Sequence, residues 1–248
     1  MTQPNDHPVH FVVGAAGGIG SALCLALAES GAQLVLAGRR AEPLERLAAQ
    51  LGARSVVLDA TDPAAVDSAV AAAAKEFGRL DGLVNLAGSI LLKPAHRTSP
   101  EEFQETLAQN LTTAFNCVRA GANAMLRTGG SIVLLSTAAA RTGLANHDAI
   151  AAAKGGVMGL TLSAAASYAP RGIRVNTVAP GLVDTPLAAP ILENEASAKA
   201  STAMHALGRL GRPDDVARAI QWLLDPANDW VTGQVLGVDG GLGTVRPR

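Results

Sequence analysis

Residues 9–20 read VHFVVGAAGGIG, an apolar run that passes without a break into a glycine-rich turn and then into an alanine-rich segment. Where strand, turn and helix follow in this order, a glycine at position 14 permits the tight turn. Gly18 and Gly20 would then let the backbone and the start of the helix approach a pyrophosphate, whose charge the free N–H groups favour. In another context these could be simple turn glycines. Here they predict a dinucleotide-binding turn.

The same alternation of short β-branched runs and alanine-rich segments continues along the chain. Strands that are apolar on both faces and separated by helices indicate a parallel sheet covered on both sides. We therefore predict an α/β fold, a doubly wound parallel sheet. The predicted strands are Val9–Val13, Gln33–Gly38, Arg54–Leu58, Gly82–Ala87, Ser131–Ser136, Ile173–Ala179 and Gln234–Val238. The predicted helices lie near Gly18–Ser30, Ala41–Leu51, Pro63–Phe77, Glu101–Arg127, Ala149–Ala169 and Pro213–Leu224.

No change of composition divides the chain, which favours one domain over residues 9–248 after a polar tail at 1–8. The stretch Pro180–Arg212 is long, irregular and interrupted by prolines. Loops of this length in compact domains are usually functional, so we expect a lid at about residues 186–211, where His205 stands out as a titratable side chain.

Charge and cysteine content exclude several classes of protein. The formal net charge is −1, without the basic footprint that nucleic acid or an anionic membrane would require. Cys24 and Cys117 lie in alanine- or leucine-rich stretches without nearby cysteine or histidine, which argues against a disulfide framework or a metal site. Residues 1–8 lack the features of an export signal, and the uncharged run 155–170 is short for a membrane span. We expect a soluble cytoplasmic protein.

The second predicted strand is followed by Arg39 and Arg40. A carboxylate at this strand end would favour NAD by bonding the ribose 2′-OH, whereas two arginines could hold a 2′-phosphate and so favour NADP(H). Alternatively, one or both arginines could solvate the start of a helix. Asp59, followed by Ala60, could reach the adenine edge or could cap the helix after Pro63, for which Asp62 is better placed.

At this point the chain resembles the short-chain dehydrogenase/reductase family over residues 9–243. The glycine run is similar to that family's TGxxxGIG motif with Val13 in place of threonine, and residues 85–88, Asn-Leu-Ala-Gly, are similar to its NNAG motif. The segment QNLTTAF at 109–115, the run Pro180–Thr185 and the sequence Val238–Gly241 also resemble family motifs. The resemblance implies a seven-stranded parallel Rossmann sheet, hydride transfer between NAD(P)H and a small-molecule carbonyl or alcohol, and a homotetramer.

The resemblance also implies a set of cofactor-contacting positions. They are Gly14, Gly18, Ile19, Gly20, Arg39, Arg40, Asp59, Ala60, Asn85, Ala87, Gly88, Lys154, Pro180, Gly181, Val183 and Thr185.

The family's chemistry uses a tyrosine that passes the proton, a lysine four residues later, a serine that polarises the carbonyl, and an asparagine. The lysine is Lys154 and the asparagine is Asn110, while Thr137, beside Ser136, occupies the serine position. The tyrosine position is Ile150, which cannot carry a proton.

No nearby tyrosine replaces it. The chain's only tyrosine, Tyr168, lies eighteen residues further along the same predicted helix, which corresponds to roughly 27 Å. His147, at the start of this helix, is a candidate acid near neutral pH. It could instead face solvent while Asp148 caps the helix.

Two functions remain open. The chain could be an NADPH-dependent oxidoreductase that is weak or takes its proton from His147 or from a lysine-bound water. It could also be a catalytically silent NADP(H)-binding subunit or sensor, paired with an active relative. The small residues of the helix near 149–169 favour a close helix contact and thus a homotetramer or a mixed tetramer.

Overall fold

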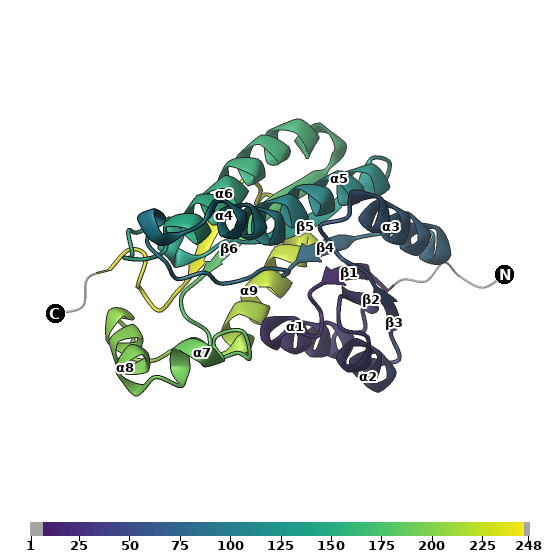
Figure 1. Ribbon diagram of the computed structural model, residues 1–248. Coiled ribbons are helices and arrows are strands. Elements are labelled where there is room, and N and C mark those ends of the chain that lie inside the picture. The colour runs from purple at the N-terminus through teal and green to yellow at the C-terminus, as the bar shows by residue number, and fades with distance from the viewer. Residues whose placement is uncertain (1–6, 246–248) are drawn as a thin grey trace.

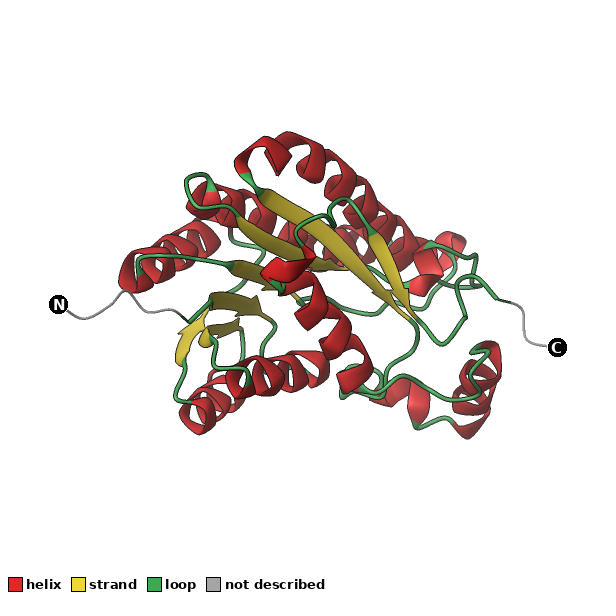
Figure 2. Cartoon of the chain, turned by 180° about the vertical axis from the view of Figure 1, so that it is seen from behind, coloured by secondary structure: helices red, strands yellow, loops and turns green. Residues whose placement is uncertain are grey.

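The computed structural model describes residues 7–245. Most of the predicted N-terminal tail therefore lies outside the described residues. Within them, seven parallel strands form one sheet in the order β3-β2-β1-β4-β5-β6-β7. The strands are β1 (Val9–Val13), β2 (Gln33–Gly38), β3 (Arg54–Val57), β4 (Gly82–Asn85), β5 (Gly130–Leu135), β6 (Ile173–Pro180) and β7 (Val235–Val238). The predicted doubly wound parallel sheet is confirmed (Figures 1 and 2).

Helices cover both faces of the sheet because each central strand is buried on both sides. Val9, Phe11 and Val13 of β1 belong to one core cluster, whereas Val12 belongs to the other. The first cluster takes in side chains of α3 (Pro63–Phe77), α5 (Thr113–Met125) and α6 (Asp148–Tyr168). The second takes in α1 (Gly18–Glu29), α2 (Ala41–Leu51) and α9 (Pro213–Leu224). Figure 1 shows α3, α5 and α6 on one side and α1 and α2 on the other.

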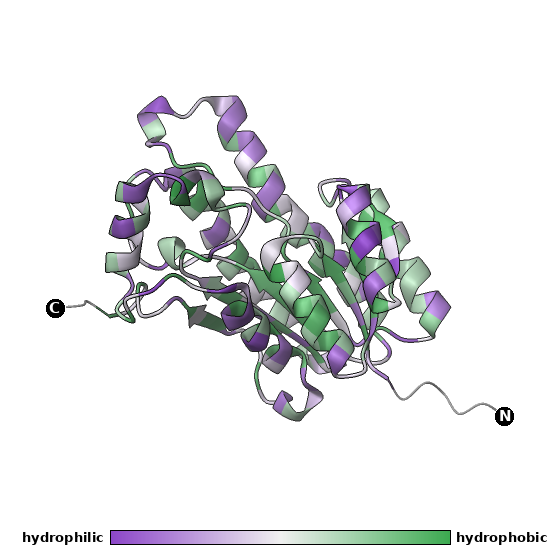
Figure 3. Cartoon of the chain, turned by 90° about the horizontal axis from the view of Figure 1, so that it is seen from below, coloured by the Kyte–Doolittle hydropathy of each residue, from purple (hydrophilic) through white to green (hydrophobic). Residues whose placement is uncertain are grey.

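Hydropathy follows this layering. In Figure 3 the strands in the interior are hydrophobic, while the outward faces of the helices carry the hydrophilic residues. The arrangement is that expected when a continuous apolar strand is sandwiched between two layers of amphipathic helices.

The predicted helix Glu101–Arg127 is wrong in one respect that matters for the site. It is divided into α4 (Pro100–Leu107), a π-helical turn η2 (Ala108–Thr112) and α5. The π turn accommodates an extra residue, and Asn110 within it is buried. Such π bulges are frequent at functional sites because they redirect one side chain without ending the helix. The spacing of the apolar residues alone does not reveal this change from α-helix to π turn.

Helix α6 is the longest helix of the fold. Within residues 7–245, the segment Asp148–Arg171, which joins α6 to the 3₁₀ turn η4 (Ala169–Arg171), is the one stretch long and apolar enough to cross a membrane. Its side chains Val157, Ala164 and Ala165 lie in the core cluster that covers β5 and β6. In this fold α6 is a core helix of the α/β layers.

Shorter elements complete the chain around the ends of the strands. The segment expected to act as a lid contains α7 (Ala189–Leu192) and α8 (Glu195–Met204). Three further 3₁₀ turns lie at η1 (Ala95–Arg97), η3 (Ala138–Ala140) and η5 (Pro226–Asn228). Because the strands are parallel, all their carboxyl ends meet at one edge of the sheet, next to the segment with α7 and α8.

Candidate active site

Two adjoining hollows lie at the carboxyl ends of the strands. The first, the nucleotide trough, has a volume of about 390 Å³ and runs along the glycine turn and the ends of β2 and β3. The second, the inner cavity, has a volume of about 210 Å³ and lies between the ends of β5 and β6 and the helices α6 and α8. Leu86, Ala87, Gly88 and Leu187 line both, so the two hollows form one continuous groove.

The predicted cofactor residues divide between the two hollows. Those that line the trough are Gly14, Gly18, Arg39, Arg40, Asp59, Ala60, Ala87 and Gly88. Those that line the inner cavity, besides Ala87 and Gly88, are Ile19, Lys154, Pro180, Gly181, Val183 and Thr185. Gly20 and Asn85 line neither.

Gly14 and Gly20 act on the shape of the turn. Gly14 has a φ of 79°, a conformation that favours glycine. A Cβ on Gly20 would overlap the Gly14 carbonyl oxygen, so the missing side chain lets α1 pack against the turn. Gly20 thus supports the turn from behind and does not line the trough.

The trough is electrostatically suited to an anion. Helix α1 starts after Gly17 with no side-chain cap and no acidic residue in its first turn, so its free N–H groups remain available. Arg39 and Arg40 are exposed beside it, and Arg40 Nη2 donates to the Ala16 carbonyl oxygen at 3.2 Å. These contacts bring the two predicted features, the glycine turn and the arginine pair, to the same end of the trough.

Asp59, after β3, also lines the trough. Its carboxylate accepts from the N–H and the hydroxyl of Thr61, at 2.9 and 2.8 Å. The Thr61 N–H is the main reason that the pKa of Asp59 is lowered, with Arg39 adding to the effect. Asp62 caps α3 by accepting from the N–H groups of Ala64 and Ala65. The residue that caps α3 is therefore Asp62 and not Asp59.

Lys154 and Asn110 converge at the junction of trough and cavity. Lys154 is only 6% exposed, and its Nζ donates to the Leu135 carbonyl oxygen at 2.8 Å. Burial lowers the pKa of Lys154 to about 8. A Cβ built on Gly88 would lie 2.8 Å from Asn110 Oδ1 and 3.4 Å from Lys154 Nζ. The glycine therefore leaves a cradle between these two polar groups.

The π turn fixes Asn110 through both ends of its amide. Its Nδ2 donates to the Thr106 carbonyl oxygen at 2.9 Å and to Ser89 Oγ at 3.0 Å, while its Oδ1 accepts from the Ser89 N–H at 3.2 Å. The side chain thus joins η2 to the segment after β4, which forms the floor of the groove.

The two hydroxyls after β5 have different roles. Ser136 Oγ donates to the Lys154 carbonyl oxygen at 2.9 Å and so ties β5 to α6. Thr137 Oγ1 accepts from the Ala139 N–H at 3.3 Å, which leaves its own proton for a ligand in the cavity that Thr137 lines. The geometry favours Thr137 over Ser136 as the hydroxyl that faces a substrate.

Ile150 and His147 also line the inner cavity. Ile150 lies one helical turn before Lys154 and is 5% exposed. His147 is half-buried at the N-cap of α6, and its Nδ1 donates to the Ala145 carbonyl oxygen at 2.8 Å. The Nε2 atom of the ring is therefore the one that could interact with a ligand in the cavity. Tyr168 is the last residue of α6, at the far end of the helix.

Two buried asparagines shape the groove, and of these only Asn116 was missed in the sequence. Asn85 accepts from the Ala87 N–H and donates to Thr113 Oγ1, which fixes the turn after β4. Asn116, buried on α5, donates to the carbonyl oxygens of Ala60 and Thr61 at 3.0 and 3.3 Å. The polar amide in an otherwise apolar stretch of helix was the available signal.

Comparison with known proteins agrees with this geometry. Residues 14–243 match the family described as Enoyl-(Acyl carrier protein) reductase. D-threitol dehydrogenase from Mycolicibacterium smegmatis is 39% identical over 242 residues, which cover 95% of this chain and 93% of that protein. A short-chain type dehydrogenase/reductase from Mycobacterium ulcerans has a TM-score of 0.92 and 30% identity, covering 97% of this chain and 91% of that chain.

The chain belongs to the short-chain dehydrogenase/reductase family. The motif resemblance found in the sequence is therefore confirmed, as is the Rossmann-type sheet that it implied. A variant of Actinorhodin Polyketide Ketoreductase with NADPH has a TM-score of 0.92 and 30% identity, covering 99% of this chain and all of that chain. In sequence and in fold, the relatives of this chain are oxidoreductases of the short-chain dehydrogenase/reductase type.

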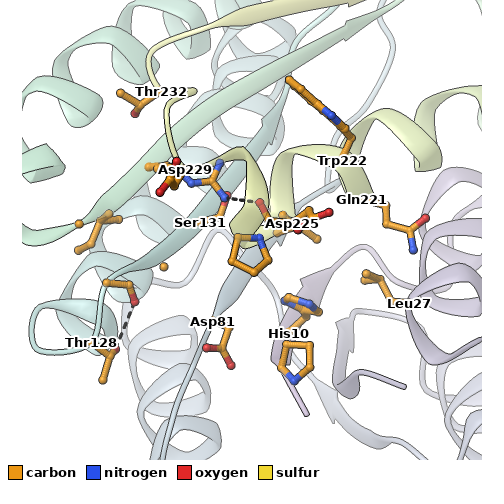
Figure 4. A pocket seen from close by; sticks show the side chains of 18 of the residues that line it. His10, Leu27, Asp81, Thr128, Ser131, Gln221, Trp222, Asp225, Asp229 and Thr232 are labelled. Carbon is orange, nitrogen blue, oxygen red and sulfur yellow. Dashed lines mark hydrogen bonds between the residues drawn. The ribbon is translucent and has the colours of Figure 1, made fainter. Parts of the chain in front are cut away.

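This dehydrogenase/reductase chain also has a larger hollow, at the amino ends of the strands (Figure 4). Its volume is about 1140 Å³, and His10, Asp81, Ser131 and Arg174 lie along it. These polar groups serve the fold: Asp81 accepts from the Val9 N–H at 2.8 Å, and Ser131 Oγ and Arg174 Nη1 donate to the Leu223 carbonyl oxygen. The predicted site residues all lie at the opposite edge of the sheet.

Proposed function

We propose that this chain is an NADP(H)-dependent oxidoreductase that transfers a hydride between the nicotinamide and a small carbonyl or alcohol substrate. We further propose that it is an atypical member of its family, weak or dependent on a substitute proton donor, because Ile150 occupies the tyrosine position. The observation that carries the proposal is the convergence of Lys154, Asn110 and Thr137 on one cavity that continues into the nucleotide trough.

The residues present fit a nicotinamide dinucleotide. The cradle left by Gly88 opens between Asn110 Oδ1 and Lys154 Nζ, and the uncapped start of α1 offers N–H groups to a pyrophosphate. Arg39 and Arg40 support NADP(H) over NAD(H), since a guanidinium can bind a 2′-phosphate through two hydrogen bonds. The NADPH in the related ketoreductase supports the same preference. When bound, the cofactor would supply the hydride.

The side chains of the inner cavity then have separate tasks. Lys154, held by the Leu135 carbonyl oxygen, would bind the nicotinamide ribose and hold a water through its other protons. Thr137 would donate its hydroxyl proton to the substrate oxygen, which polarises the carbonyl. Asn110 keeps the turn after β4 in place beside Lys154. The proton for the product would come from Nε2 of a doubly protonated His147, whose Nδ1–H stays on the Ala145 carbonyl oxygen, or from the water on Lys154.

The lining of the inner cavity supports a compact, uncharged substrate. Apart from the polar groups already described, and Ser201 and His205 at the end of α8, the walls are apolar: Ile90, Leu92, Leu144, Ile150, Leu187, Ile191, Met204 and Leu242 line it. A ketone with a short aliphatic or alicyclic body would bury its surface against these side chains. A charged acid or phosphate would lose its hydration without a matching cation on the apolar wall.

We also propose that the protein acts in the cytoplasm as a homotetramer, with neither nucleic acid nor membrane as a partner. A Cβ on Gly156 would clash with Leu111, so this glycine serves packing within the chain. Gly155 and Gly159 face open space, and Leu162 and Phe115 are more than half exposed on α6 and α5. These positions support a contact between copies, and light scattering that gave a monomer at micromolar concentration would refute it.

The function is tested by nucleotide titration followed by product analysis. We expect NADPH to bind more tightly than NADH, and an activated apolar ketone to be reduced slowly to its alcohol. If His147 is the acid, His147→Ala abolishes this turnover. Failure of NADPH to bind would refute the proposal, whereas tight NADPH binding without any product would identify a silent binding subunit.

A further inference from the structure

His205, immediately after α8, makes two hydrogen bonds that fix its tautomer. Its Nδ1 pairs with the Ser201 carbonyl oxygen at 2.7 Å, and its Nε2 pairs with the Leu182 N–H at 3.1 Å. A carbonyl oxygen only accepts and an N–H only donates, so Nδ1 carries the proton and Nε2 offers its lone pair. The residue is 2% exposed, and each ring nitrogen has a backbone partner.

The ring lies between three segments of the chain that are distant in sequence. A Cβ on Gly181 would overlap His205 Nε2, and a Cβ on Gly240 would lie 3.4 Å from His205 Cβ. Both glycines therefore leave the space that the imidazole fills. The Leu207 N–H donates to the Gly240 carbonyl oxygen at 3.0 Å, which holds the chain after His205 against the same C-terminal turn. His205 thus connects α8, the turn after β6 and the turn after β7.

The turn after β6 forms one wall of the inner cavity, next to the end of the nucleotide trough. Pro180, Gly181, Val183 and Thr185 of this turn line the cavity, and Thr185 packs against the position where a Cβ on Gly18 would lie. Other backbone hydrogen bonds join this turn to segments away from α8: the Gly181 N–H donates to the Val238 carbonyl oxygen, and the Leu182 carbonyl oxygen accepts from the Gly211 N–H. The Leu182 N–H depends on His205 for its acceptor.

We propose that His205 is a positioning residue: it holds the turn from Pro180 to Val183 in the shape that receives the nicotinamide end of the cofactor, and it couples this shape to α8. This inference rests on the proposed function for the identity of the ligand. The imidazole does not serve as the proton donor, since both of its nitrogens are committed to backbone groups. An unpaired N–H at this half-buried turn would favour a rearranged loop, which the cofactor would have to reverse on binding.

Three substitutions separate the two hydrogen bonds. In His205→Gln, the side-chain oxygen reaches the position of Nε2 and can accept from the Leu182 N–H. In His205→Asn, the shorter amide reaches the position of Nδ1 and can donate to Ser201 but not accept from Leu182. His205→Leu fills the space and makes neither bond. Circular dichroism and thermal unfolding verify that each variant is folded.

The first measurement is hydrogen exchange at the Leu182 amide in the protein without nucleotide. We expect His205→Asn and His205→Leu to exchange this amide at least about tenfold faster than the natural protein and His205→Gln. The second measurement is the dissociation constant for NADPH, which we expect to rise about tenfold in His205→Asn and His205→Leu and to stay near the natural value in His205→Gln.

The results separate this inference from the proposed function. Equal exchange of Leu182 in all four proteins would overturn the inference, and so would a His205→Gln variant as impaired in NADPH binding as His205→Leu, because packing alone would then explain the effect. Altered exchange at Leu182 with an unchanged dissociation constant would equally overturn it. Failure of the natural protein to bind NADPH would refute the proposed function, while the exchange data would still decide whether His205 holds the turn.

Discussion

The two edges of the sheet use polar groups in opposite ways. At the amino edge, the hollow is larger, about 1140 Å³ against about 210 Å³ for the inner cavity, and it is richer in charged side chains. There, Arg174 donates to the carbonyl oxygens of Leu223 and Asp225, and Asp81 accepts from Val9. At the carboxyl edge, Lys154 is buried against one carbonyl oxygen, and the first turn of α1 is uncapped.

This difference shows that size and charge alone do not identify a site. Polar groups whose hydrogen bonds close the ends of strands and helices have little left for a ligand. Lys154 is buried and hydrogen-bonded to a carbonyl oxygen, so its remaining ammonium protons are available to a ligand. Changes at the amino edge should therefore act on fold stability, and changes at the carboxyl edge on ligand binding.

The largest expected effect concerns His10 at the amino edge, shown with Asp81 in Figure 4. Burial lowers the pKa of His10 from 6.5 to about 4, against an opposing effect of Asp81, and its Nδ1 has no hydrogen-bond partner among the described residues. Between these pH values the unfolded chain binds a proton that the folded chain does not. The free energy of unfolding should therefore fall by about 3 kcal/mol from pH 7 to pH 4 because of this group.

Chemical denaturation of the natural protein and His10→Leu at several pH values isolates this contribution. A difference in packing changes the free energy of unfolding by the same amount at every pH. The test is therefore whether the difference in free energy of unfolding between the two proteins changes as the pH falls. Parallel profiles would contradict the assignment. NADPH binding at pH 7 should be the same in both, since His10 lies at the edge away from the trough.

The second effect, at the carboxyl edge, has the same dependence on pH but lies in a higher pH range. Burial lowers the pKa of Lys154 to about 8, so the charged form destabilises the fold fully below pH 8, and the penalty disappears as the pH rises towards 10.5. Lys154→Met should therefore raise the free energy of unfolding at pH 7 by about 2 kcal/mol, allowing for the lost bond to Leu135. The same change should weaken NADPH binding.

Lys75→Met is the matched control, because Lys75 is exposed on α3 and its loss should not stabilise the protein. Denaturation at pH 7 and pH 9.5 measures the difference in free energy of unfolding between Lys154→Met and the natural protein, and this difference should be smaller at pH 9.5. A Lys154→Met protein that is less stable than the natural one at pH 7 would show that the lysine supports the fold rather than a ligand.

The sequence was sufficient for the sheet because its signal is local. Alternate residues of β1 enter the two core clusters, as a strand buried on both faces requires, and the glycine turn follows directly. The π turn was not predicted because it replaces the hydrogen-bond partners of η2 without changing the apolar pattern. The bond between His205 and Leu182 spans 23 positions, and only folding brings these two residues together.

The site was predicted to the extent that the motifs are contiguous. Thr137, His147, Ile150 and Lys154 were identified through the family resemblance, and all four line the inner cavity. The family resemblance assigned the serine position to Thr137, but it could not reveal that the Ser136 hydroxyl binds the Lys154 carbonyl oxygen. Gly20 was expected near the pyrophosphate, but its contact with Gly14 lies behind the turn.

A third prediction concerns nucleotide preference at the trough. Arg39→Ala should raise the dissociation constant for NADPH about tenfold and leave that for NADH unchanged, since only NADPH carries a 2′-phosphate. Arg46→Ala is the control: Arg46 is exposed on the neighbouring α2 and pairs with Glu42 at 3.8 Å. Fluorescence titration with both nucleotides measures the effect. Equal weakening for NADPH and NADH would contradict the assignment of Arg39.

The most direct test of the central claim is the rate of ketone reduction by Ile150→Tyr with NADPH, compared with Ile150→Phe and the natural protein. A phenol at position 150 would share a helix face with Lys154, whose ammonium would lower the pKa of the phenol. We predict at least a tenfold gain for tyrosine and none for phenylalanine, which adds the ring without the hydroxyl. Ile150→Tyr protein that binds NADPH yet reduces the ketone no faster than Ile150→Phe would contradict the claim that the replacement of the tyrosine by Ile150 is what limits catalysis in this cavity.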